Sequence, residues 1–175
     1  NRWGLSMNRG IQALVLAVAV VIAIPLPVRA DPALQTLVTN GPAANRLNVV
    51  FFSEGYTSGE LGQFLVDATN ALAALFAKEP YSEYRSYLNG FAIAVPSVQS
   101  GSDHPKYNVL KDTVFNSTYD LAGDLVITIP ENATGVGKVN ALLQQLIPEF
   151  QTNRDLTVLL VNDPIRGGSG GPRII

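Results

Sequence analysis

Four short apolar runs along the chain are typical of buried strands. Leu47–Phe52 and Leu156–Val161 are continuous β-prone runs bounded by turn residues, and such runs are expected where a strand is covered on both faces. Phe91–Val95 and Leu125–Ile129 are two further runs of this kind. The pattern therefore predicts a sheet of about four strands.

Two of the segments between these runs carry apolar residues at helical spacing. The first segment extends to Ala77, and Thr57 with Glu60 three residues later forms a capping box at its start. The second segment ends near Phe150, and Thr134 is expected to cap its start. We expect both helices to cover the same face of the sheet. The opposite face would then be bare and the domain only marginally stable.

The remaining segments are shorter or irregular. Pro80 suits the first turn of a short helix through about Leu88, with Gly90 as its stop. Residues 97–120 are expected to form a polar loop followed by an irregular or hairpin segment, and residues 31–44 a short leading segment. The order of strands and helices predicts an α/β fold with a mostly parallel or mixed sheet and helices packed on it.

The first 30 residues have the pattern of a secretory signal peptide. Met7 is followed by Arg9 and by an apolar run through Ile24, and Ala30 ends the segment before the expected cleavage. An uncleaved membrane anchor is the alternative, but the apolar run is shorter than the roughly 20 residues that span a bilayer. The expected parts of the chain are upstream residues with a signal peptide at 1–30, the leading segment at 31–44 and one α/β domain at 45–175.

Charge and cysteine content narrow the choice of partners and sites. Cleavage after Ala30 removes three of the 12 Lys and Arg and none of the 14 Asp and Glu, which leaves a net charge of −5. No cations are clustered, which argues against nucleic acid or an anionic membrane as a partner. The chain has no cysteine, which excludes disulfides and thiolate metal sites. We expect a secreted or periplasmic protein without a membrane contact after cleavage.

Five blocks of sequence together resemble one known family. They are Asn45–Thr57, Lys78–Tyr81, Val95–Ser97, Ser100–Pro105 and Val161–Gly171. Over about residues 45 to 171, the chain is similar to the IgA peptidase family of secreted zinc metallopeptidases. The resemblance implies the N-terminal portion of a zincin-like fold, a protein or peptide substrate, and zinc as the cofactor of the complete enzyme.

The resemblance also implies that the catalytic half is missing from this sequence. In the family, a helix with a His-Glu-x-x-His motif follows shortly after a glycine-rich turn, which is Gly167–Gly171 in this sequence. A zinc-activated water then hydrolyses peptide bonds in the family enzymes. Here the single histidine is His104, which we expect in a surface loop, and one imidazole cannot hold a catalytic zinc. We therefore assign no catalytic residue, metal ligand or cofactor to this chain and expect it to be inactive alone. A stand-alone exported binding or structural module is the alternative.

The glycine-rich turn is the candidate binding element. By resemblance it lies along the substrate cleft, where glycines allow a peptide to approach closely. A flexible loop that only reaches the next element is the alternative. The candidate cleft-wall residues are Asn162, Asp163, Gly167, Gly168, Ser169, Gly170 and Gly171.

Two other motifs match known functional patterns in part, but the residues around them do not fit those functions. Gly167–Gly171 matches the spacing of a serine-hydrolase nucleophile turn, but no helix follows it and His104 lies upstream. Residues 132–138 resemble a phosphate loop but lack its first glycine and the hydroxyl residue after the lysine. Asn116 and Asn132 are glycosylation acceptors in form.

Three acidic residues end or follow a predicted strand, where α/β folds often place functional groups. They are Glu54, Asp103 and Asp163. Acidic residues at strand ends are also ordinary turn formers, so none of the three is assigned a catalytic role.

Overall fold

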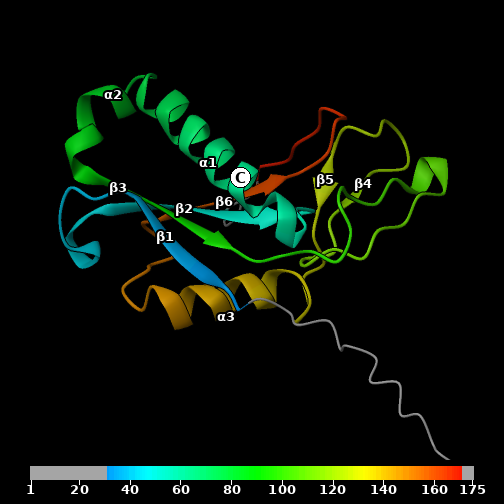
Figure 1. Ribbon diagram of the computed structural model, residues 1–175. Coiled ribbons are helices and arrows are strands. Elements are labelled where there is room, and N and C mark those ends of the chain that lie inside the picture. Colours follow the sequence, from blue (N-terminus) through cyan, green and yellow to red (C-terminus); the bar gives the residue numbers. More distant parts are fainter. Residues whose placement is uncertain (1–30, 171–175) are drawn as a thin grey trace, which may run out of the picture.

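The fold is built on a central mixed sheet of four strands in the order β1-β3-β2-β6 (Figure 1). The computed structural model describes residues 31–170. β2 (Leu47–Glu54) pairs in parallel with β3 (Leu88–Ala94) and with β6 (Leu156–Val161). β1 (Ala33–Val38) lies within the leading segment and pairs antiparallel with β3. The predicted α/β fold with a mixed sheet is confirmed.

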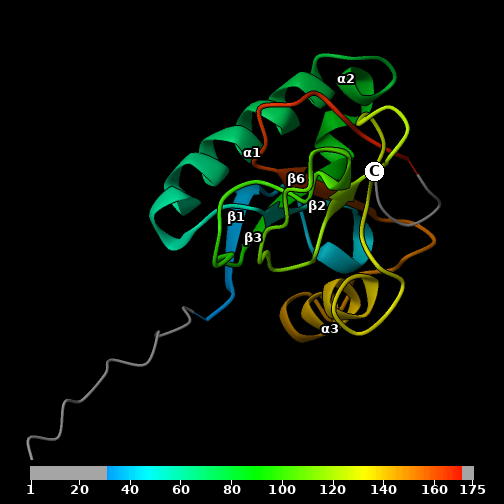
Figure 2. The ribbon, with the colours of Figure 1, turned by 90° about the vertical axis from the view of Figure 1, so that its right-hand side faces the viewer.

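Both faces of this sheet are covered. Val50 and Phe52 of β2 pack on one face with α3 (Val136–Leu146), and Val49 and Phe51 pack on the other with α1 (Leu61–Phe76). The two views in Figures 1 and 2 place α1 and α3 on opposite sides of the strands. The prediction that both helices cover one face is therefore wrong, and so is the prediction of a bare sheet face.

The order of the strands explains why the helices separate. The connection from β2 through α1 (Leu61–Phe76) leads to the neighbouring β3. The connection from β3 through α3 leads back past β2 to β6. Because crossovers between parallel strands are right-handed, two connections that run in opposite directions along a sheet lie on opposite faces.

Gly90 lies inside β3 and does not end a helix. The segment after Pro80 forms only α2 (Tyr81–Tyr84) and a single 3-10 turn before β3 begins at Leu88. A Cβ at Gly90 would lie 2.3 Å from Cδ2 of Leu72 in α1. The glycine therefore lets α1 approach the sheet closely. Its role is in tertiary packing, although glycine at this place in the sequence is also typical of a helix end. The 3-10 turns are Ala43–Asn45, Ser58–Glu60, Arg85–Tyr87 and Pro105–Tyr107.

The two predicted helix starts have different outcomes. Thr57 and Glu60 form the predicted capping box, in which the Thr57 amide donates to Glu60 Oε2 at 2.8 Å. The box caps the 3-10 turn that leads into α1. Thr134 does not cap α3, because its hydroxyl donates instead to Asn132 Oδ1 at 2.7 Å and Gly135 is the N-cap residue.

A smaller lobe, residues 97–130, extends from one end of the sheet. It contains a separate antiparallel pair, β4 (Thr118–Tyr119) and β5 (Ile127–Thr128). The predicted strand at 125–129 is thus shorter than expected and lies outside the main sheet. Among residues 31–170, none of the helices combines the length and the apolar composition that crossing a bilayer requires.

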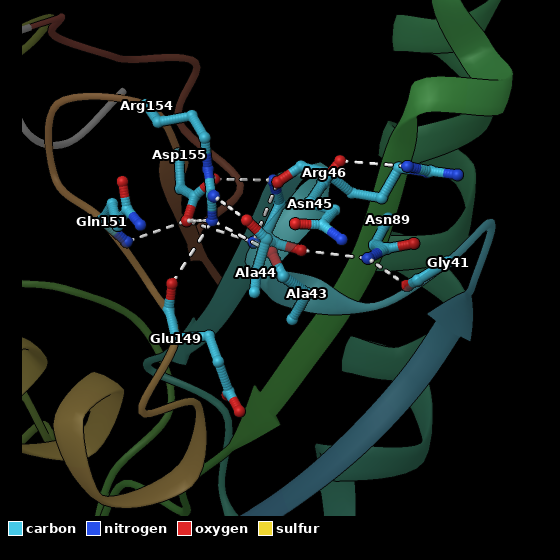
Figure 3. A network of polar contacts seen from close by, with 11 residues as sticks. Gly41, Ala43, Ala44, Asn45, Arg46, Asn89, Glu149, Gln151, Arg154 and Asp155 are labelled. Atoms are coloured by element: carbon cyan, nitrogen blue, oxygen red, sulfur yellow. Dashed lines mark hydrogen bonds and ion pairs between the residues drawn. The ribbon is translucent and has the colours of Figure 1, made fainter.

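A polar network holds together the starts of the parallel strands (Figure 3). Asp155, next to the start of β6, accepts hydrogen bonds from the Asn48 amide at 2.9 Å and the Gln151 amide at 2.8 Å. Arg154 Nε donates to Asp155 at 2.7 Å, and Asn48 in turn accepts from Asn89 of β3 at 3.1 Å. Burial raises the pKa of Asp155, but Arg154 and the other donors outweigh it, so the net pKa is lowered.

Candidate functional site

The carboxyl ends of β2, β3 and β6 meet at one edge of the sheet, where α/β folds place their functional groups. The smaller lobe packs against this edge, and two of its contacts fix it there. The predicted acidic residues Glu54 and Asp163 both lie here, one ending β2 and the other following β6. This edge is therefore the candidate functional site.

Glu54 is a buried anchor for the lobe. Its side chain is 0% exposed. Its carboxylate accepts hydrogen bonds from the Thr113 hydroxyl at 2.6 Å and from the amides of Phe115 at 2.9 Å and Ser117 at 2.8 Å. Three internal donors satisfy a carboxylate that has no access to solvent. This geometry gives Glu54 a structural role.

Two glycines form the second contact between β2 and the lobe. Gly55 and Gly101 have φ values of +69° and +101°, which other residues rarely adopt. The Gly101 amide donates to the Gly55 carbonyl at 3.1 Å. A Cβ at Gly55 would lie 2.1 Å from the Gly101 carbonyl oxygen. Only glycine allows the two backbones to cross at this distance.

His104 lies buried between two carboxylates, so the expectation of a surface-loop histidine is wrong. The side chain of Asp124 is 2.8 Å from Nδ1, and that of Asp163 is 2.9 Å from Nε2. The Tyr119 ring stacks on the imidazole with centroids 4.2 Å apart. Because Asp124 and Asp163 are distant in sequence, no local pattern could indicate this burial. The Asp103 carboxylate accepts a hydrogen bond from the Lys111 amide at 2.5 Å, across the loop that contains His104.

The two carboxylates favour the charged form of the imidazole. Burial lowers the pKa of His104, but the hydrogen bonds to Asp124 and Asp163 outweigh it, so the net pKa is raised above its ordinary value. Burial, followed by the charges of Asp163 and Asp124, raises the pKa of Tyr119 to about 12. Tyr119 is therefore a neutral stacking partner at neutral pH.

The donor set at this edge does not fit a catalytic zinc. Zinc takes a neutral imidazole nitrogen with a free lone pair, whereas both ring nitrogens of His104 face a carboxylate within hydrogen-bond distance. Within residues 31–170, no group of three or more His, Cys, Asp or Glu is placed to hold a metal ion. The imidazole of His104 is therefore held in a contact with two carboxylates and presents no free lone pair to a metal.

The glycine-rich turn is bonded to the smaller lobe. The Tyr119 hydroxyl donates to the Ile165 carbonyl at 2.6 Å, and the Gly168 amide donates to the Leu125 carbonyl at 2.8 Å. The Ser169 hydroxyl donates to the Ile127 carbonyl. These contacts join the segment to both strands of the β4–β5 pair or to residues beside them.

The glycines in this segment face two different surroundings. A Cβ at Gly167 would lie 2.5 Å from Tyr119 Cε1, so this glycine is required for contact with the lobe. A Cβ at Gly168 or Gly170 would meet nothing within 4 Å. The segment therefore presents one side to the lobe and leaves open space beside alternate residues.

Gly167, Gly168 and Gly170 line a groove of about 720 Å3. Its apolar lining includes Ile127, Ile129 and Leu159, and its charged lining includes Glu131 and Arg166. No local sequence pattern indicates these five residues as one site, because they lie on separate segments and share no motif. Tyr119 also lines this groove and was missed for the same reason.

The candidate cleft-wall residues divide between this groove and a smaller hollow. Five of them line the groove: Asp163, Gly167, Gly168, Ser169 and Gly170. Asn162 lines a neighbouring hollow of about 440 Å3, together with Asp163 and His104. Gly171 lies outside the described residues.

One protein family matches nearly all of the described residues. Residues 35–172 match the family described as IgA Peptidase M64. The match begins in β1 and continues through the glycine-rich segment, so it includes every strand of the sheet and both long helices. A comparison with curated proteins gave no match.

Proposed function

Since the chain belongs to the IgA peptidase M64 family, we propose that it is the N-terminal part of a secreted zinc metallopeptidase that hydrolyses peptide bonds. The observation that carries this proposal is the groove at the carboxyl edge of the sheet, walled by Gly167–Gly170. The chain supplies a zincin-like scaffold and one wall of the substrate cleft. In the complete enzyme, zinc would supply the hydrolytic water chemistry through ligands other than residues 31–170.

The proposed substrate is an extended peptide lying along the glycine segment. Gly168 and Gly170 have open space where a side chain would stand, so a peptide backbone is able to approach them. Ile127, Ile129 and Leu159 offer apolar contacts to its side chains. A groove with apolar lining and few charged groups is typical of ligand sites.

We expect the purified chain to bind casein-derived peptides in this groove without cleaving them. NMR titration of the 15N-labelled protein should shift the Gly168 and Gly170 resonances. The resonances of Gly59, in the turn before α1, and of Gly62, in the first turn of α1, should stay unchanged. Mass spectrometry of the same samples should find intact peptides, and elemental analysis should find less than one zinc per chain, because the described donors do not fit that metal.

The matched variants are Gly168→Val and Gly59→Val. The first should weaken peptide binding about tenfold, equivalent to about 1.4 kcal/mol, because its side chain fills the open space beside the segment. The second should leave binding unchanged. Stoichiometric zinc with chelator-sensitive cleavage would contradict the inactivity of this chain, and peptide shifts away from the groove would contradict its role as the cleft.

Export is a separate part of the proposal and concerns residues outside the described range. The signal-peptide pattern of residues 1–30 leads us to propose a secreted or periplasmic location with cleavage after Ala30. N-terminal sequencing of exported material should begin at Asp31. Membrane-bound protein that retains Leu14–Ile24 would contradict cleavage.

A further inference from the structure

His104 connects two segments that are otherwise distant in the sequence. Asp124 lies in the smaller lobe, 20 residues after the histidine, and Asp163 begins the segment that follows β6, 59 residues after it. The exposed fraction of His104 is 6% and that of Asp124 is 3%. One buried imidazole therefore joins the smaller lobe to the segment Asp163–Gly170 that follows β6.

The number of ring protons decides how many of these contacts form. An imidazolium has two N–H donors, whereas a neutral imidazole has one donor and one lone pair. With both carboxylates ionised, only the charged ring donates to Asp124 and Asp163 together. After the loss of one proton, a nitrogen lone pair faces a carboxylate oxygen across one of the two contacts.

The two carboxylates differ in the hydrogen-bond donors that they retain when the histidine loses a proton. Within the described residues, the Asp124 carboxylate has His104 as its only hydrogen-bond partner. The Asp163 carboxylate also accepts from the Ser102 amide at 3.2 Å and the Ile165 amide at 2.9 Å. A buried carboxylate without a donor costs more than one that retains two. The proton that leaves is therefore the one on Nε2, which faces Asp163.

We propose that protonated His104 is a pH-dependent latch that holds the segment Asp163–Gly170 against the smaller lobe. Loss of the Nε2 proton opens the latch at Asp163 and loosens this segment. The contacts from Tyr119 to Ile165 and from Gly168 to Leu125 remain, so the segment loses one attachment out of several. The latch does not depend on the proposed peptidase function.

The groups around the imidazole are compatible with this switch. Tyr119 stacks on the ring, and the Tyr107 ring lies 6.4 Å away with the Lys106 ammonium 5.5 Å from its centroid. Lys111 lines the same hollow as His104. The Asp103 carboxylate accepts a hydrogen bond from the backbone amide of Lys111. The pKa of Tyr119 is about 12, so its ring stays neutral while the histidine titrates.

The direction of the switch follows from the raised pKa of His104. A histidine whose pKa is higher in the folded state stabilises the fold fully below its unfolded value of about 6.5. This stabilisation is lost as the pH rises through the folded-state pKa. The latch is therefore closed in mildly acidic solution and opens on the alkaline side.

An NMR titration of the full chain between pH 5 and pH 9 tests the latch. The chain has a single histidine, so its imidazole signals need no assignment. We expect an imidazole midpoint above about 6.5, with the amide resonances of Ile165 and Gly168 moving at the same midpoint.

Asp163→Asn should lower the imidazole midpoint and abolish the linked shifts of Ile165 and Gly168. The control Asp112→Asn, at an exposed carboxylate, should change neither. His104→Gln should leave the amide resonances of Ile165 and Gly168 independent of pH. If the His104→Gln variant does not fold, Asp163→Asn provides the test. A midpoint at or below about 6.5, or segment resonances that ignore the imidazole titration, would overturn the proposal.

Discussion

Replacing Gly55 by alanine is expected to destabilise the fold by about 3–5 kcal/mol. The new Cβ would lie 2.1 Å from the Gly101 carbonyl oxygen, and the φ of +69° would be strained for any residue with a side chain. The clashing atom is a backbone oxygen rather than the end of a flexible side chain. Relief of the clash therefore requires the lobe to move away from the end of β2. Urea unfolding followed by far-UV circular dichroism measures the loss.

Gly59→Ala is the matched control. Nothing lies within 4 Å of a Cβ at this position, and Gly59 is in the 3-10 turn between Thr57 and α1. Alanine reduces the freedom of the unfolded chain, so this variant should be neutral or more stable by up to about 1 kcal/mol. Equal urea midpoints for the Gly55 and Gly59 variants would show that the close crossing at Gly101 does not form in solution.

Asp155→Ala is expected to cost about 3–5 kcal/mol. The change leaves the Arg154 guanidinium without its carboxylate and removes the acceptor for the amides of Asn48 and Gln151. The Asp155 side chain is fully buried, with 0% exposure. Asp112→Ala, at an exposed carboxylate with no side-chain partner among the described residues, should stay within about 0.5 kcal/mol of the parent.

The effect of Asp155→Ala should also depend on pH. The pKa of Asp155 is lowered in the folded state, so its stabilisation is fully present above the unfolded value of about 3.9 and is lost as the pH falls through the folded-state pKa. The stability difference from the parent should therefore shrink in strong acid and remain constant near neutral pH. A difference that grows on acidification would contradict the assigned contacts.

Strands that consist of consecutive apolar residues could be predicted from the sequence. β2 and β6 were located because each is a continuous apolar run between turn residues. β1 was missed, since it is a partly exposed edge strand with no such run. The family resemblance, drawn from five separated blocks, is confirmed by the match over residues 35–172.

The errors arise where distant residues decide the local structure. Gly90 was interpreted as a helix stop because a local pattern cannot reveal that Leu72 packs against it. His104 was placed on the surface because its burial depends on Asp124 and Asp163, which come from two other segments. The lining of the groove was missed for the same physical reason.

The Asp155 network and the candidate site lie at opposite ends of β2. From Asn48 to Glu54 the strand spans about 20 Å, which is more than the roughly 10 Å beyond which the effects of substitutions usually add. Changes to the groove and changes to the network should therefore combine without coupling. The strand starts can be strengthened first, and the stability gained there then offsets the cost of altering the groove to accept different peptides.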